Sequence, residues 1–148
     1  MDISYRQADR DNIPAIEELF TAMLQSVNSS DEAEGYEAGY LDKFFSGSND
    51  IIYTAVVYGR VIGYISVEAY PDHVYLDDLS VSEEYRGCGV GTRLIELAEK
   101  HGTAISAKLS VLHVEKSNEK AYRLYSRLGY NVSAEEGSRY RMAKQLQR

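Results

Sequence analysis

Hydrophobic residues recur along the N-terminal part of the chain with first a strand-like and then a helical period. Residues 3–8 have strand character. Five apolar side chains then recur at helical spacing: Ile13, Ile16, Phe20, Met23 and Val27. Asp11 and Asn12 can cap this helix. After a polar, acidic loop at residues 29–35, aromatic and apolar residues on one face predict a second helix over residues 36–45.

Strand patterns dominate the middle of the chain. Residues 51–58 and 61–68 are rich in Val, Ile and Tyr, and the short break at Gly59 and Arg60 joins them into a hairpin. A third strand at residues 74–81 follows after a turn. We therefore expect an antiparallel meander of three strands.

The second half of the chain alternates between helix and strand. A glycine-rich loop at residues 87–91 leads into a helix with an apolar face: Val90, Leu94, Leu97, Ala98 and His101. A strand at 107–114 and a helix at 117–128 follow, with Ser117 as the expected N-cap. Two strands, at 130–133 and 139–145, complete the order β-α-α-β-β-β-α-β-α-β-β. No repeat or linker interrupts it, so we expect one α/β (α+β) domain over residues 1–148.

Charge is distributed unevenly along the chain. The net charge is −7, which argues against nucleic acid or an anionic membrane as the main partner. Up to Tyr85 there are 17 acids and 4 bases, and from Arg86 onward there are 6 acids and 12 bases. This asymmetry fits either two independently solvated surfaces or a bipolar site that holds an anion on the C-terminal half and a cation on the N-terminal half.

The location and the metal content can also be predicted from composition. The N-terminus is too polar for a secretory signal, and no apolar run is long enough to span a bilayer, so we expect a cytoplasmic protein without a membrane partner. The single cysteine, Cys88, can form neither an internal disulfide nor a cysteine metal site, and we expect no metal.

The glycine-rich loop joins a strand to a helix, which is a favourable place for an anion. Backbone N–H groups and the positive end of the helix dipole converge there, and Gly87, Gly89 and Gly91 remove side chains that would keep a phosphate away. The physics predicts a pyrophosphate site, although a tight turn requiring positive φ would also explain the glycines. Thr92 and Arg93 stand where a P-loop needs Lys and Ser/Thr, and the third glycine comes one residue too early for a dinucleotide fingerprint.

Two motifs in this region resemble those of the GNAT superfamily of acetyltransferases. The acetyl-CoA-binding motif of that family, Arg/Gln-x-x-Gly-x-Gly/Ala, is matched by Arg86, Gly89 and Gly91. The downstream motif Asn-x-x-Ala-x-x-Leu-Tyr-x-x-x-Gly-Phe/Tyr is matched at every position: Asn118, Ala121, Leu124, Tyr125, Gly129 and Tyr130. The resemblance implies the GNAT fold, with a mixed central sheet of about seven strands, and acetyl-CoA as cosubstrate.

The resemblance also implies which residues bind acetyl-CoA. The pantetheine arm would bond to the main chain of Leu79 and Val81 and to the side chain of Asn118, which could instead simply cap its helix. The pyrophosphate would be held by loop amides: Arg86, Gly87, Cys88, Gly89, Val90, Gly91 and Thr92. Lys120 and Arg123 are either phosphate partners or surface charges. Cys88 occupies a variable slot of the motif, and we do not expect it to be a nucleophile.

The catalytic roles follow from the same resemblance. Tyr125 matches the tyrosine that protonates the departing sulfur in the family, although it could also be an ordinary core aromatic. For the base, Asp77 and Asp78 resemble the acidic stretch of spermidine/spermine acetyltransferases. Adjacent strand residues point to opposite faces, so we expect only one of them to face the cleft. His73 or a chain of waters is an alternative base.

We therefore expect an N-acetyltransferase that moves an acetyl group from acetyl-CoA to a primary amine by direct attack. The acidic N-terminal half favours a small cationic amine such as a polyamine as the acceptor. The alternatives are acetylation of a protein or peptide amine and a non-catalytic acyl-CoA sensor. Dimers are frequent in the family, so the resemblance is also compatible with a homodimer.

Overall fold

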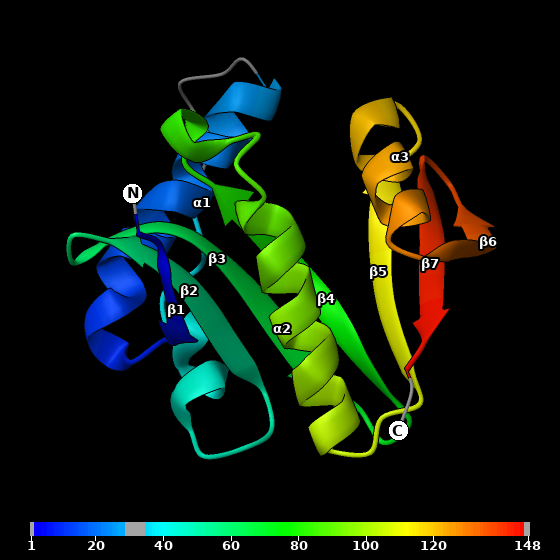
Figure 1. The fold of residues 1–148 in the computed structure, drawn as a ribbon, viewed down its shortest axis with the longest axis horizontal. Helices are drawn as coiled ribbons and strands as arrows, with labels where there is room; N and C mark the ends of the chain where they lie inside the picture. Colours follow the sequence, from blue (N-terminus) through cyan, green and yellow to red (C-terminus); the bar gives the residue numbers. More distant parts are fainter. Residues whose placement is uncertain (1, 29–34, 147–148) are drawn as a thin grey trace.

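The strands form one mixed sheet in the computed structural model, which describes residues 2–28 and 35–146. The strand order is β1-β2-β3-β4-β5-β7-β6, and all neighbours are antiparallel except β4 and β5 (Figure 1). The seven strands are β1 (Ser4–Gln7), β2 (Ile51–Val57), β3 (Arg60–Ala69), β4 (His73–Val81), β5 (Leu109–Glu115), β6 (Asn131–Glu136) and β7 (Arg139–Gln145). The expected GNAT fold with a mixed seven-stranded sheet is confirmed.

Helices cover the two faces of the sheet with separate hydrophobic clusters. On one face, α1 (Ile13–Asn28) and the 3-10 helix η2 (Tyr40–Phe45) pack over Ile52 and Tyr64. On the other, α2 (Val90–Ala104) and α3 (Glu119–Arg127) cover a larger core (Figure 1). Two short 3-10 helices, η1 (Arg10–Asn12) and η3 (Glu83–Tyr85), precede α1 and α2.

Two sequence predictions about the helices were wrong. The second helix, expected over residues 36–45, is the 3-10 helix η2 alone, because Gly39 takes a left-handed backbone with φ of 80° that starts the turn only at Tyr40. The cap of α3 is Asn118, not Ser117: Asn118 Oδ1 accepts the Ala121 N–H at 3.1 Å.

The parallel strands β4 and β5 pair only at their beginnings and then separate. Three residue pairs join them, and the last is Tyr75 with Val111, after which the two strands diverge (Figure 1). On the other side of β4, Ser82 N donates to Ile62 O at 2.7 Å. Because an antiparallel ladder alternates, the N–H and C=O groups of Leu79 and Val81 point away from β3, toward the gap beside β5.

A β-bulge in β4 changes the direction of its acidic residues. Leu76 pairs with Val67 and Asp78 with Ser66, so Asp77 is the extra residue. Before the bulge Leu76 faces the larger core, and after it Leu79 does. Asp77 and Asp78 therefore both project to the face covered by α1 and η2, which corrects the expectation that only one of them can face a given cleft.

A buried polar network ties α2 to the strands beyond the gap. The Tyr130 hydroxyl lies 2.7 Å from Ser110 Oγ and donates to Glu99 Oε2 at 2.9 Å, and Lys144 Nζ donates to Glu99 Oε1 at 3.0 Å. Because these groups come from α2, β5, β7 and the residue before β6, the network links α2 to the strands beyond the gap.

Candidate active site

The loop before α2 leaves the start of that helix open. Gly87 and Gly89 adopt φ of 77° and 82°, a left-handed backbone that side chains other than Asn and Asp rarely tolerate. Gly89 is the N-cap of α2, and no side chain caps the helix there. The N–H groups of the first turn are therefore presented to an incoming anion, together with the positive end of a 15-residue helix.

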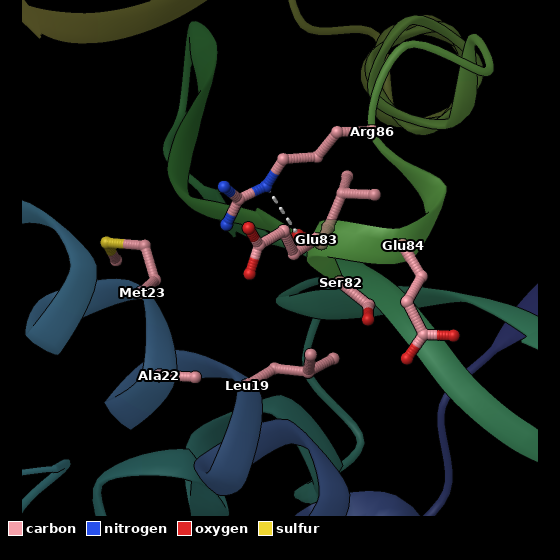
Figure 2. Close-up of a pocket in the computed structure, with 8 residues that line it drawn as sticks. Leu19, Ala22, Met23, Ser82, Glu83, Glu84 and Arg86 are labelled. Carbon is pink, nitrogen blue, oxygen red and sulfur yellow. Dashed lines mark hydrogen bonds between the residues drawn. The ribbon is translucent and has the colours of Figure 1, made fainter.

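The side chain of Arg86 folds back toward β4 and away from the glycine loop. Its Nε donates to Val81 O at 3.2 Å, and the main chain of Val81 is one of the groups that the family resemblance implies for the pantetheine arm. Figure 2 shows Arg86 reaching over Glu83, with Leu19, Ala22 and Met23 of α1 on the opposite wall of a hollow of about 490 Å³. Arg86 is thus placed beside the gap as well as beside the loop. The neighbouring Cys88 is exposed, and its Sγ lies 3.9 Å from Arg86 O.

Tyr125 lies on α3 and Asn118 is the N-cap of that helix, which packs on β5, the strand across the gap from β4 (Figure 1). The Tyr125 ring packs against the larger core and meets Tyr130 edge-on, with centroids 6.2 Å apart. Burial raises the pKa of Tyr125, so its hydroxyl stays protonated at neutral pH. Asn118 uses its Oδ1 to cap α3, which leaves its Nδ2 group as the donor available to a ligand.

Asp77 and Asp78 are each held by a tyrosine hydroxyl from the segment before and within η2. Tyr40 donates to Asp77 Oδ2 and Tyr36 to Asp78 Oδ2, both at 2.6 Å. The two tyrosine rings stack with centroids 4.9 Å apart, and Tyr36 also stacks on Phe20 at 3.8 Å. The helix that the sequence predicts over residues 36–45 gives no indication of these contacts.

Burial dominates the titration of the acidic pair. It raises the pKa of Asp78 to about 6, while the hydrogen bond from Tyr36 acts in the opposite direction and the charge of Asp77 adds to the rise. Burial also raises the pKa of Asp77, against the hydrogen bond from Tyr40. A carboxylate with a pKa near 6 is a workable proton acceptor at neutral pH.

A second hydrogen-bonded chain runs beside the acidic pair, where β4 and β5 start to separate. The Tyr75 hydroxyl lies 2.7 Å from His113 Nδ1, and His113 Nε2 lies 2.9 Å from Glu136 Oε1. Tyr75 and His113 belong to strands that looked purely structural in the sequence, and Glu136 belongs to β6, so only the strand order β4-β5-β7-β6 reveals these contacts.

Tyr75 and His113 line a hollow of about 230 Å³ that also contains Glu68, His73 and Arg141. His73, an alternative base in the sequence, stacks on Tyr70 at 4.8 Å and pairs with Asp72 at 2.7 Å. We call the surface formed by this hollow, Asp77 and Asp78 the acceptor face. Of the acids in the loop at residues 29–37, only Glu37 lies within the described residues, and it is exposed.

Comparison with known proteins identifies the family. A sequence model described as "Acetyltransferase (GNAT) family" matches residues 13–130. The chain belongs to the GNAT family. Its Arg86 and Asn118 motifs both fall inside the matched range.

Two curated relatives show how far this likeness extends. The chain is 34% identical over 96 residues to an uncharacterised N-acetyltransferase of Methanocaldococcus jannaschii, which covers 64% of this chain and 62% of the relative. It is 28% identical over 124 residues to the catalytic subunit of the N-terminal acetyltransferase A complex of Arabidopsis thaliana, with 79% of this chain and 65% of the relative covered. The matches therefore span less than two thirds of the length of these relatives.

A shorter match and a solved structure complete the comparison. Over 56 residues, 37% of this chain and 30% of the relative, the chain is 41% identical to the spermidine N(1)-acetyltransferase of Escherichia coli strain K12. The PaiA N-acetyltransferase of Thermoplasma acidophilum, solved in complex with coenzyme A, superimposes with a TM-score of 0.82 at 18% identity over 98% of this chain and 99% of that one. This last likeness concerns the fold.

The described residues contain neither a candidate membrane-spanning helix nor a candidate metal cluster. None of the helices within residues 2–28 and 35–146 has the length and apolar character needed to cross a bilayer. The same residues contain no group of three or more His, Cys, Asp or Glu side chains arranged to hold a metal ion.

Proposed function

We propose that this protein transfers an acetyl group from acetyl-CoA to a primary amine, and that the amine is a small cation such as a polyamine. The observation that carries the proposal is the gap between β4 and β5. The glycine loop, the α3 residues Tyr125 and Asn118 and the acidic pair all come from elements that border this one opening.

The residues around the gap fit the cosubstrate. The uncapped first turn of α2 suits a pyrophosphate, with amides from Arg86 to Thr92 as its donors. The main-chain groups of Leu79 and the N–H of Val81 point toward the gap and suit an extended arm that adds to β4 like another strand, while the Val81 carbonyl accepts the bond from Arg86 Nε. Asn118 Nδ2 would reach the same arm from α3. Bound in this way, acetyl-CoA supplies the activated acetyl group.

The acceptor amine must lose a proton before it can attack. Asp77 and Asp78 attract its ammonium form, and we assign the proton to Asp78, the carboxylate whose pKa lies near 6. The hydrogen-bonded chain of Tyr75, His113 and Glu136 lies on the same face and runs from the start of the gap to the edge strand β6. On the other side of the gap, Tyr125 donates a proton to the sulfur that leaves.

A protein or peptide amine is the second candidate acceptor. Similarity to the N-terminal acetyltransferase subunit extends over 79% of this chain, a longer stretch than the 37% matched by the spermidine enzyme. The acidic pair favours the small cation, because two carboxylates on one face suit an acceptor with more than one ammonium group.

A substrate panel with detection of the released thiol tests the proposal. Polyamines, monoamines and peptides with free N-termini would be compared by kcat/KM in the same buffer. We expect the polyamines to be the best substrates and their advantage to shrink as salt rises, because screening weakens charge attraction over about 10 Å at 0.1 M salt. Faster turnover of peptides would favour the second candidate. Binding of acetyl-CoA without turnover of any acceptor would identify a sensor.

A further inference from the structure

Lys43 of η2 places an ammonium group among the acidic side chains of the acceptor face. Its Nζ donates a hydrogen bond to Glu68 Oε2 and lies 5.0 Å from the centroid of the Tyr40 ring and 5.2 Å from that of Phe44. Such a position between a carboxylate and aromatic faces is favourable for any ammonium ion. The chain thus supplies its own cation where the acceptor is expected to bring one.

The charge of Lys43 reaches the acidic pair as well. Burial raises the pKa of both Asp77 and Asp78, the charge of Glu68 adds to each rise, and the charge of Lys43 acts against it. The charges of Glu68 and Lys43 therefore have opposite effects on Asp77 and Asp78: Glu68 raises their pKa values and Lys43 lowers them.

The two partners of this ion pair differ in their freedom to move. The Glu68 side chain is 15% exposed, and its other oxygen accepts the Tyr70 hydroxyl at 3.3 Å. The Lys43 side chain is 39% exposed. The carboxylate is therefore fixed in the wall of the hollow, whereas the lysine can turn into solvent and leave that carboxylate to another cation.

We propose that Lys43 sets the charge selectivity of the acceptor face, because its ammonium competes with the second ammonium of a diamine for Glu68. This inference rests on the proposed function, since it concerns the acceptor of the same site. Lys43 makes the face less selective for multiply charged amines than its three carboxylates alone would make it.

The test compares 1,4-diaminobutane with butylamine, two acceptors of equal chain length that differ by one ammonium group. Lys43→Met removes the charge and keeps an unbranched side chain, and Lys43→Arg keeps the charge as the matched control. For each variant, kcat/KM would be measured for both amines at low salt. Calorimetry would measure the binding of both amines to the CoA complex, and thermal unfolding would verify the fold.

We expect Lys43→Met to raise the ratio of kcat/KM for diaminobutane to that for butylamine by about 5- to 30-fold. This range lies between the effect of losing an exposed charge pair and that of losing a buried one. Lys43→Arg should keep the wild-type preference, and Glu68→Gln in the Lys43→Met background should abolish the gain. A merely structural role would change both amines equally, and that result, or an unchanged preference, overturns the proposal. If no amine is acetylated, the proposed function fails, while the calorimetric preference still decides the role of Lys43.

Discussion

The hydrogen bond from Tyr36 to Asp78 gives a direct test of the base. Tyr36→Phe removes the donor to Asp78 Oδ2, 2.6 Å away, and keeps the ring that stacks between Phe20 and Tyr40. The donor stabilises the ionised carboxylate, so its loss must raise the pKa of Asp78 above its value of about 6. A hydrogen bond to a charged group contributes about 1.5–3 kcal/mol, and one pKa unit corresponds to about 1.4 kcal/mol, so we expect a rise of about one to two units.

The ratio of kcat/KM between the variant and the wild type isolates this shift, because the titration of the amine itself cancels in the ratio. If Asp78 accepts the proton, the ratio should be near unity above about pH 9 and fall to between about one tenth and one hundredth below about pH 5, since the variant loses its base at a higher pH. The assay would follow thiol release with a pyridyl disulfide, which reacts in acid as well as in base.

Tyr40→Phe is the matched control, since it removes the equivalent donor from Asp77 and leaves the bond of Tyr36 to Asp78 in place. Its ratio should vary less with pH. A Tyr36→Phe ratio that does not change with pH would show that Asp78 is not the base, and a larger change in Tyr40→Phe would transfer the role to Asp77.

Three further variants test other parts of the site. Gly89→Asp and Gly89→Asn introduce side chains of equal size that both tolerate the positive φ, and only the aspartate adds a charge. In calorimetry, Gly89→Asp should therefore bind acetyl-CoA about ten-fold or more weakly than Gly89→Asn, whereas equal losses would argue against a pyrophosphate at this turn. Tyr125→Phe should lower kcat by about one to three orders of magnitude with little change in acetyl-CoA affinity. An unchanged kcat, where the chemical step is rate-limiting, would show that Tyr125 is not the general acid. Asp78→Asn should lower activity but stabilise the fold by about 1–3 kcal/mol at pH 8, because the folded protein ionises Asp78 only above about pH 6 and an unfolded chain does so near pH 4. That gain in melting temperature should disappear below about pH 4, and a gain that persists there would have another cause.

The sequence was most informative where local spacing decides the structure. The strands of the meander, the glycine loop and the helices α1, α2 and α3 follow from hydrophobic period and turn residues, and all are present. The downstream family motif named Asn118 and Tyr125, which are the N-cap of α3 and a residue within that helix. The segment from residue 36 to 45 was harder, because its tyrosines are buried by contacts with Phe20 and β4, not by a helical face.

Contacts between distant strands accounted for what the sequence missed. Tyr75, His113 and Glu136 are far apart in the chain; the first two look like ordinary strand residues, and Glu136 lies between the two strands expected at 130–133 and 139–145. Their hydrogen bonds exist only because the sheet has the order β4-β5-β7-β6. Lys43 and Glu68 are likewise joined by packing of η2 on the sheet, a contact with no local signal.

The bulge at Asp77 shows why strand alternation alone gave the wrong expectation that only one of the two aspartates faces the cleft. A regular strand would place Asp78 on the side of Leu76, inside the larger core, where an ionised carboxylate has no partner. One extra residue rotates Asp78 to the side of Asp77, where two tyrosine hydroxyls meet both carboxylates, and it returns Leu79 to the core. The same single residue therefore keeps the hydrophobic register of β4 on both sides and creates a doubly acidic surface next to the gap. The sequence carries a signal for this bulge, because the alternation of apolar residues is interrupted at Leu76-Asp77-Asp78-Leu79. Two adjacent acids between two apolar strand residues are the pattern from which such a bulge could be predicted.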